Sequence, residues 1–198
     1  PLVHRATSQW FISMEKKDLR KKALKAIDDT DFYPERGRDR IRSMIETRPD
    51  WCISRQRIWG VPLPLFVSKK TKEPLKDPEV IENIARIFEK EGADCWFTDD
   101  PQKFLGKKYK KEDYIKSNDI VEVWFDSGAT HSYVLEKRKD LTWPASMYLE
   151  GSDQHRGWFH SSLLESCGTR GKAPFKSILT HGFVVDGKGL KMSKSTGN

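Results

Sequence analysis

The chain has 198 residues, of which 36% are hydrophobic and 33% are charged, and its net charge is +7. This length suits one domain or a little more, and no apolar run approaches the ~20 residues of a membrane span, so the composition indicates a soluble protein without a membrane segment. Three cysteines without a Cys-x-x-Cys pair argue against disulfides and against a zinc site within the chain, and they predict a cytoplasmic protein.

The first part of the chain predicts two helices separated by a short extended segment. Apolar residues at helical spacing predict a helix from Met14 to Asp28, whose other faces are crowded with lysines. Tyr33 precedes a proline, which favours extended backbone. A second helix is predicted from Gly37 to Thr47. The basic excess is concentrated in residues 1–117, which is compatible with nucleic acid as a partner and equally with ordinary solvated faces.

The middle of the chain is less regular. Residues 61–67 predict a short strand that contains two prolines and therefore lies at a sheet edge. Residues 68–77 indicate a turn or hairpin. An apolar stripe that begins at Val80 predicts a helix that ends before Gly92. Residues 94–117 are charged and allow no prediction of structure.

Strand patterns return in the last part of the chain. Residues 121–125 alternate in polarity and predict a strand that ends in a turn at 126–128. A strand at 146–149, a helix at 156–167 and a strand at 177–185 follow. A strand, a helix and a strand with connections of this length predict a βαβ unit with parallel strands. The expected fold class is therefore α/β.

Polar residues follow the first strand of this unit. Glu150, Gly151, Asp153 and Gln154 stand where its carboxyl end is predicted, and ligands of open α/β sheets bind at that edge. A carboxylate there can accept hydrogen bonds from an ammonium or a ribose hydroxyl, and Gly151 permits close approach to the backbone. Asp153 can alternatively cap the following helix. Two carboxylates and an amide exceed what capping requires, so we expect a ligand site.

A basic loop follows the second strand. Gly187 and Gly189 make a flexible connection, and three lysines follow the strand: Lys188, Lys191 and Lys194. Lysine ammonium groups can neutralise charge that develops on a triphosphate. The alternative is a solvated basic loop, which is the commoner meaning of two lysines at this spacing. Because this loop leaves the carboxyl end of the second predicted strand, it faces the same crevice as Glu150 and Asp153, which favours phosphate binding.

A further combination of side chains stands earlier in the chain. Arg55 and Arg57 flank Gln56 and lie close in sequence to Trp51 and Trp59. Guanidinium groups beside aromatic surfaces suit a single-stranded RNA end, through phosphate contacts and stacking. The alternative is that both arginines pair with local acidic residues.

Four segments give the sequence a specific resemblance. They are Arg48–Arg57, Val123–Gly128, Tyr148–Phe159 and Lys191–Ser195. In this order they resemble the class I aminoacyl-tRNA synthetases, and the block around Glu150 is similar to that of the isoleucine-specific members. The resemblance covers nearly the whole chain and is weakest across residues 68–117.

The resemblance implies activation of isoleucine by ATP, accompanied by Mg²⁺, and transfer of the isoleucyl group to the 3′ end of isoleucine tRNA. It implies that Glu150, Gly151, Asp153 and Gln154 contact the aminoacyl-adenylate. The remaining implied roles are adenine binding near His181, Gly182 and Phe183, catalysis at the phosphates by Lys191 and Lys194, and an isoleucine pocket of Trp124 and Trp158.

Packing in a core is the alternative for both tryptophans of that pocket. Trp158 stands early in a helix beside the ligand turn, which favours the pocket, whereas for Trp124 the two interpretations are balanced without the resemblance. Four of the other five tryptophans are assigned to packing: Trp51, Trp59, Trp96 and Trp143. The tRNA acceptor end would meet Arg55 and Arg57.

The resemblance also implies a domain organisation. Residues 118–198 correspond to the second half of a Rossmann-type catalytic domain, and residues 1–117 to a mixed α+β connective stem that includes a catalytic-domain segment at Trp51–Val67. The first half of that domain with its histidine motif, the editing domain and the anticodon-binding domain of the same parent chain are not matched. We therefore expect a fragment that is inactive alone.

Other functions remain open at this point. An enzyme for valine, leucine or methionine is the nearest alternative. A non-catalytic RNA-binding module is a different class, against which the preserved pair of Glu150 and Lys194 argues. A P-loop hydrolase is disfavoured because the sequence lacks Gly-x-x-x-x-Gly-Lys-Ser/Thr.

Overall fold

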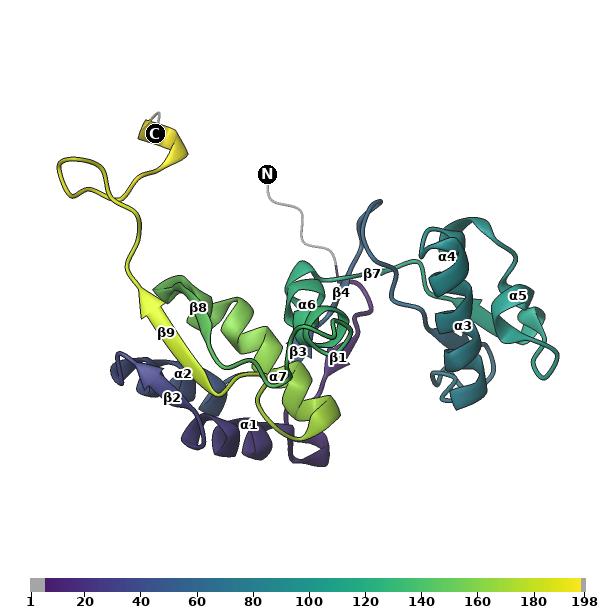
Figure 1. Cartoon of the computed structure of the whole chain (residues 1–198). Helices are drawn as coiled ribbons and strands as arrows, with labels where there is room; N and C mark the ends of the chain where they lie inside the picture. The colour runs from purple at the N-terminus through teal and green to yellow at the C-terminus, as the bar shows by residue number, and fades with distance from the viewer. Residues whose placement is uncertain (1–5, 197–198) are drawn as a thin grey trace. The chain divides into compact units, whose positions relative to one another are not determined.

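The computed structural model describes residues 6–196, which form two compact units that alternate along the chain (Figure 1). Unit 1 comprises residues 6–10 and 52–123, and unit 2 comprises residues 11–51 and 124–196. Residues 11–51 therefore share a unit with the predicted βαβ segment. The assignment of residues 1–117 to a connective stem concerns the parent protein and stays a prediction. No helix of the described residues is long and apolar enough to cross a membrane.

Unit 2 begins with a helical pair. Helix α1 spans Leu19–Asp28 after a short 3₁₀ turn, η1 (Lys16–Asp18), and α2 spans Arg36–Glu46. Both predicted helices are confirmed, but the first begins later than Met14. Lys17 and Asp18 adopt positive φ angles of 54° and 57°, which belong to left-handed backbone and interrupt a continuous helix. Strand β2 (Asp31–Tyr33) connects the two helices.

The centre of unit 2 is a three-stranded sheet in the order β2–β9–β8. Strands β8 (Tyr148–Gly151) and β9 (Ser177–His181) run parallel, and helix α7 (Trp158–Arg170) connects them. The predicted parallel pair is therefore confirmed. Strand β2 also pairs in parallel with β9, with Phe32 opposite Ile178. The extended backbone predicted at Tyr33 is confirmed, but three residues are too few to show a strand period, so the pairing of this strand could not be predicted.

The predicted strand at 121–125 is wrong. Strand β7 contains only Ile120–Val121, and a helix, α6 (Val123–Gly128), replaces the rest. A π-helical turn, η3 (His131–Leu135), follows. Gly128 packs so closely on Ser161 of α7 that a Cβ there would lie 3.0 Å from the Ser161 carbonyl carbon. This tertiary contact overrides the strand preference of the local sequence.

Helix α7 forms the middle of the core of unit 2. Its residues from Phe159 to Cys167 are all buried, so this stretch has no solvent-exposed face. Apolar residues of both N-terminal helices and of the sheet are buried in the same unit: Ala23, Ile27, Ile41, Ile45, Phe32 and Ile178. This packing holds the carboxyl ends of β2, β9 and β8 at one edge.

Unit 1 has a core of its own around Trp96, which is fully buried with Phe66 and Phe104. Strand β5 pairs antiparallel with β6, and β4 pairs antiparallel with β7. The predicted helix before Gly92 is confirmed as α3, which Asp77 caps and Pro78 begins. The elements of this unit are β4 (Ser54–Arg55), β5 (Phe66–Ser68), α3 (Pro78–Glu91), α4 (Cys95–Thr98), α5 (Pro101–Leu105), η2 (Lys111–Asp113) and β6 (Tyr114–Lys116). Two further strands, β1 (Phe11–Ile12) and β3 (Trp51–Cys52), pair with each other.

Candidate functional site

The carboxyl ends of β8 and β9 bring Glu150 and His181 face to face. Glu150 Oε1 accepts a hydrogen bond from the Gly151 amide at 2.8 Å and lies 3.7 Å from His181 Nε2. Both side chains are about half exposed, at 51% and 47%. This edge therefore presents a carboxylate and an imidazole to solvent at adjacent parallel strands, where α/β sheets bind ligands.

The turn after β8, η4 (Ser152–Arg156), presents the next two predicted residues. Asp153 is exposed, and a Cβ on Gly151 would lie 2.7 Å from its Oδ1, so glycine is needed for this geometry. Gln154 Oε1 accepts a hydrogen bond from the Trp158 amide at 2.9 Å. The side chain that accepts a backbone amide at the start of α7 is therefore Gln154, not Asp153. The Asp153 carboxylate remains at the surface beside Gly151.

The first tryptophan of the predicted pocket lies against Gly157, and the second follows this glycine in the sequence. Trp124 is 41% exposed, and a Cβ on Gly157 would lie 2.9 Å from its Cη2. Trp158 is half-buried and stacks on Tyr148, with ring centroids 4.0 Å apart and planes 5° apart. The two indoles therefore share one region of unit 2, next to Gln154. This placement suits both a pocket wall and partial packing.

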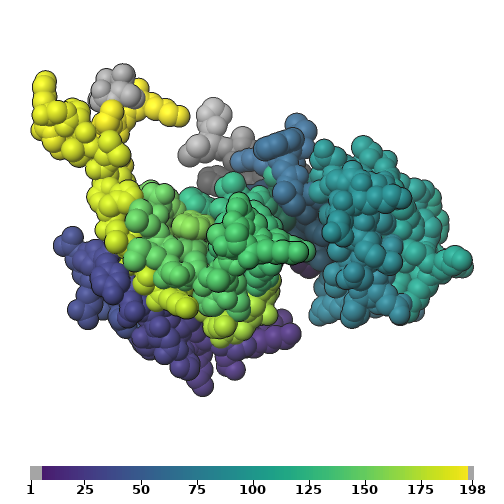
Figure 2. Space-filling view, viewed as in Figure 1, coloured from purple at the N-terminus to yellow at the C-terminus, as the bar shows by residue number. Residues whose placement is uncertain are grey.

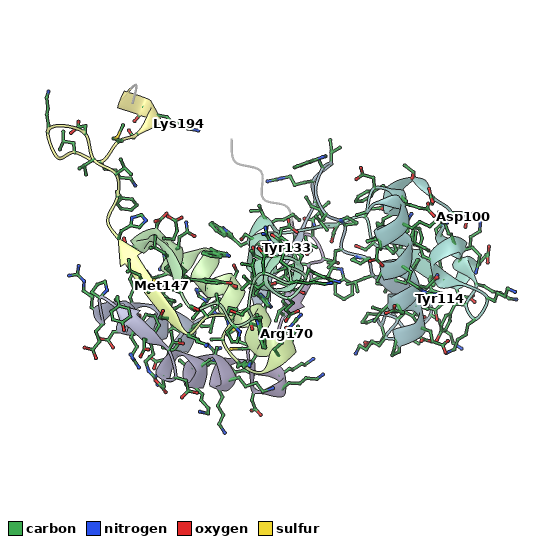
Figure 3. The ribbon with its side chains drawn as sticks, viewed as in Figure 1. Asp100, Tyr114, Tyr133, Met147, Arg170 and Lys194 are labelled. Carbon is green, nitrogen blue, oxygen red and sulfur yellow. The ribbon has the colours of Figure 1, made fainter. Side chains whose placement is uncertain are left out.

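The predicted phosphate-binding loop forms an arm beyond β9 (yellow in Figures 1 and 2). The predicted strand at 177–185 ends early, at His181, and residues 184–192 fold back as a hairpin in which Val185 pairs with Lys191. Lys191 Nζ lies 3.6 Å from the centre of the Phe183 ring. Lys194 begins a 3₁₀ turn, η5 (Lys194–Thr196), near the end of this arm (Figure 3). No contact joins either lysine to Glu150 within residues 6–196.

The residues proposed for an RNA end lie in unit 1 and have different environments. The guanidinium of Arg55 already has partners within unit 1. Its Nη1 donates to the Cys52 and Ser54 carbonyls, and its Nη2 lies 3.5 Å from Glu122 Oε2. Arg57 is exposed. Trp59 is 89% exposed, so its assignment to packing is wrong. The loop that carries it leaves the indole nothing in unit 1 to cover it.

Burial keeps three histidines of unit 2 neutral. It lowers the pKa of His160 to about 3, with a further contribution from Arg48, and it lowers the pKa of His131 and of His155. His155 Nδ1 lies 2.8 Å from the Ser152 carbonyl oxygen. That oxygen can only accept, so Nδ1 carries the hydrogen and Nε2 presents a lone pair.

Sequence reasoning missed a pocket of about 300 Å³ at the same sheet edge. The first turn of α2, the turn after β8 and the end of β9 line it, through Arg36, Arg40, His155 and Thr180 among others. Of its lining residues, the sequence had indicated His181 and Gly182, whereas His155, inside the Asp-Gln-His segment, was given no role. The arginines could not be recognised because β2, which brings α2 to this edge, was not predicted.

One group of three potential metal ligands occurs in the described part of the chain. Glu91, Cys95 and Asp99 meet in unit 1, but Lys103 Nζ lies 2.5 Å from Glu91 Oε2 and 2.7 Å from Asp99 Oδ2. The single ammonium pairs with both carboxylates, so this cluster is an ion-pair network. The three cysteines are free thiols.

Comparisons with known proteins agree with the predicted resemblance. Residues 3–198 match the family profile described as tRNA synthetases class I (I, L, M and V). The chain is 79% identical over all 198 residues to the isoleucine–tRNA ligase of Pelagibacter ubique. It is 56% identical over 203 aligned residues to that of Caldicellulosiruptor saccharolyticus. In both cases all of this chain is covered and 22% of the relative, so the chain spans about a fifth of the length of these relatives. A solved structure, the ternary complex of agnB2 LeuRS, tRNA and LeuAMS from Agrobacterium radiobacter K84, is similar with 20% identity and a TM-score of 0.48, covering 75% of this chain and 22% of that one.

Proposed function

Since the chain belongs to the class I tRNA synthetase family of the I, L, M and V group, we propose that it is part of an enzyme that charges tRNA with isoleucine. The observation that carries the proposal is the meeting of Glu150 and His181 at the carboxyl edge of two parallel strands. The choice of isoleucine rests on the relatives that share 79% and 56% of the sequence, which are isoleucine–tRNA ligases.

The proposed reaction has two steps. The carboxylate of isoleucine attacks the α-phosphorus of ATP, which forms isoleucyl-adenylate and releases pyrophosphate. A hydroxyl of the terminal ribose of the tRNA then attacks the acyl carbon, which forms the ester and releases AMP. The sheet would act as the second half of a Rossmann-type catalytic domain, with the adenylate across its carboxyl edge.

We assign the adenylate to the edge formed by β8 and β9. Glu150 would accept hydrogen bonds from the ammonium of isoleucine, because its carboxylate is half exposed and has one backbone partner. Asp153 and Gln154 would face the ribose, and Gly151 would let it approach the backbone. His181, Gly182 and Phe183 would lie near the adenine.

The amino acid pocket would form between Trp124, which lies against Gly157, and Trp158, the residue that follows Gly157. Two indoles can exclude larger side chains, but a missing methylene changes binding by only about 1–3 kcal/mol. That magnitude comes from this class of enzyme itself, where isoleucine is distinguished from valine. Discrimination against valine therefore has to be completed elsewhere in the parent protein, in an editing domain.

Lys191 and Lys194 would stabilise the charge that develops on the phosphates, after the arm has moved toward the sheet edge. Mg²⁺ would enter with ATP and bind its phosphates, because the described residues of this edge supply no group of three ligands. Arg57 would meet the acceptor end of the tRNA, with Arg55 held by Glu122 beside it. The chain alone is proposed to be inactive, because transition-state groups act as a unit.

The test is a calorimetric titration of the 198-residue chain with a non-hydrolysable isoleucyl-adenylate analogue, with valyl and leucyl analogues beside it. We expect a preference for the isoleucyl analogue and at least about a tenfold loss of affinity in Glu150→Ala, because a hydrogen-bonded charge is lost. Glu89→Ala, an exposed carboxylate of unit 1, is the control and should bind normally.

Three results would count against the proposal. Equal binding by Glu150→Ala would remove the assigned role of the carboxylate. A preference for the valyl or leucyl analogue would change the amino acid. Robust isoleucine-dependent exchange of pyrophosphate into ATP by the chain itself would contradict its proposed inactivity.

A further inference from the structure

Two hollows lie along helix α1 of unit 2, which packs against α7 (Figure 1), and Lys22 lines both of them. The first, of about 500 Å³, is at the amino end of α1, beside Phe11 and Gly168. The second, of about 420 Å³, is at its carboxyl end, beside Lys176. Both hollows together form the α1 groove. Its second hollow lies where β2 and β9 begin, whereas the candidate functional site lies where the strands end.

Apolar side chains line both hollows of the α1 groove. In the first hollow, Phe11 and Ile12 of β1 lie beside Leu19, and the Phe11 side chain is 56% exposed. In the second hollow, Pro144 and Phe175 supply apolar surface. A single exposed apolar residue is common on protein surfaces, but one that stands in a concave surface offers a place for an apolar group from outside.

Lysines without ion-pair partners surround the first hollow. Lys16, Lys17 and Lys22 are exposed, and among residues 6–196 none of the three forms an ion pair. Within the same range no carboxylate lines this hollow. Lys16 and Lys17 stand in η1, at the amino end of α1, where the helix dipole disfavours positive charge. An anion bound among these lysines would relieve their repulsion from one another and from the helix end.

The carboxylates nearest in sequence are directed elsewhere. Glu15 Oε1 accepts a hydrogen bond from Arg20 Nε at 2.7 Å, so its charge is already paired. Asp18 lines a different hollow, together with Lys21 and Asp28. Neither carboxylate therefore neutralises the lysines of the first hollow.

The second hollow combines the same types of residue. Lys172 and Lys176 line it, and neither forms an ion pair in the described part of the chain. Of its two carboxylates, Asp29 is paired with Lys25 at 2.9 Å, and Asp31 is exposed. The carboxyl ends of α1 and α7 border this hollow and offset part of its positive charge, so the first hollow is the stronger anion site.

We propose that the α1 groove binds an extended acidic peptide segment of a partner protein. The segment places one apolar side chain in each hollow and its carboxylates against the lysines. Helix α1 has 10 residues and is therefore about 15 Å long. Extended backbone covers that distance with about five residues, so two apolar residues about five positions apart fit both hollows. This surface takes no part in the proposed aminoacylation and does not depend on it.

Single-stranded RNA is also an anion, but the α1 groove suits it less well. Every cation that lines the groove is a lysine, whereas RNA recognition relies on arginine forks and on aromatic stacking of several bases. Phe11 is the one exposed aromatic side chain along the groove in the part of the chain that the structure describes. A phosphate backbone would also leave the apolar surface of both hollows unfilled. An acidic peptide matches both the charge and the apolar surface.

The test uses the 198-residue chain and a fluorescein-labelled peptide, Asp-Glu-Leu-Asp-Glu-Asp-Asp-Phe-Asp-Glu, whose affinity is measured by fluorescence anisotropy at several salt concentrations. The groove variant Lys16→Gln/Lys17→Gln/Lys22→Gln should bind about tenfold more weakly or worse, with a shallower dependence on salt, because three charge contacts are lost. The matched control removes the same charge from three exposed lysines of unit 1, in Lys69→Gln/Lys70→Gln/Lys72→Gln. Its affinity should stay within about twofold of the original chain.

The apolar contact is tested without a change of charge. Phe11→Ala should weaken binding by about threefold or more, whereas Ile81→Ala, which shortens an exposed apolar residue of α3, should not. Gly168→Met places a side chain in the first hollow and should weaken binding as well. A Cβ at Gly168 would lie 3.6 Å from Leu19 Cδ1, an ordinary contact, so the fold tolerates this change. Circular dichroism confirms that each variant is folded.

Any of five results overturns the inference. They are unchanged binding in the groove variant, an equal loss in the matched control, equal binding of a peptide with serine in place of leucine and phenylalanine, tighter binding of an oligouridine RNA than of the peptide, and no binding by the folded chain. All groove variants should bind the isoleucyl-adenylate analogue normally, so the proposed function is tested separately.

Discussion

Residues that are buried as neutral polar groups govern how unit 2 responds to pH. His160 lies in the middle of α7, is 4% exposed, and neither of its ring nitrogens has a hydrogen-bond partner among the described residues. Burial lowers its pKa to about 3 in the folded protein. As the pH falls, the unfolded chain therefore protonates this histidine well before the folded protein does. His131 and His155 are shifted in the same direction.

The sign of the resulting pH dependence is fixed. An unfolded histidine titrates near 6.5, so below that pH the unfolded chain binds protons that the folded chain refuses. The free energy of unfolding should therefore fall as the pH is lowered from 7.5 to 5, by up to about 1.4 kcal/mol per pH unit for each such histidine. His160→Phe removes one such histidine, so the slope of the unfolding free energy against pH should become smaller by the contribution of about one proton. Urea unfolding at several pH values measures this, and identical slopes for both proteins would refute it.

At the scale of secondary-structure elements, several helices and strands that a local pattern marks were predicted correctly. The apolar stripe of α3 is local, and it predicted that helix correctly. The parallel pair β8 and β9 followed from two apolar runs at crossover spacing. In contrast, α6 was predicted as a strand because its packing partner is α7, which is far away in sequence and gives no local sign.

The candidate site shows the same difference between residues marked by a local pattern and residues brought in by distant segments. Glu150 stands at a strand end that the sequence could place, and the structure sets it against His181, where β9 ends earlier than predicted. The arginines of the neighbouring pocket depended on β2, whose pairing spans from Asp31 to Ser177 and is invisible in either segment alone. Contacts between distant segments are the part that no local pattern encodes.

The close contact between α6 and α7 predicts that Gly128 cannot be replaced by a larger residue without loss of stability. A Cβ on Gly128 would clash with the Glu165 carboxylate, lying 2.9 Å from its Cδ, and with the Ser161 backbone. Gly128→Ala should therefore destabilise the protein by about 1–3 kcal/mol, as overpacking does. Gly187→Ala is the control, because nothing lies within 4 Å of a Cβ there. Thermal unfolding of both variants decides this; equal melting temperatures would show that α6 can move away without cost.

At the scale of the whole molecule, the chain forms two separate hydrophobic cores, one in each unit. Unit 1 buries Trp96, Phe66 and Phe104 around α3, while unit 2 buries residues 159–167 of α7, which packs against α1 and against Tyr148 of β8. Residues 52–123 lie within the sequence of unit 2, between its first and last parts. Each unit therefore has its own source of stability.

A cavity in one core should act first on its own unit. Phe104 is fully buried, so Phe104→Ala should destabilise unit 1 by about 3–5 kcal/mol. Hydrogen exchange should accelerate in α3, α4 and β5, while the amides of α7 and β9 keep their protection. Equal loss of protection in α7 would show that the two cores unfold as one cooperative block.

The pairing of β2 with β9 has a consequence for the order in which the protein is made. Phe32 of β2 leaves the ribosome long before its partner Ile178, whereas every segment of unit 1 has been synthesised once Val123 has emerged. Unit 1 can therefore fold during translation, and unit 2 has to wait for its last strand. During that interval the apolar faces of α1 and α2 are uncovered, and the long sequence separation makes closure of the sheet slow. The nascent chain is accordingly most in need of chaperones between the synthesis of α2 and that of β9.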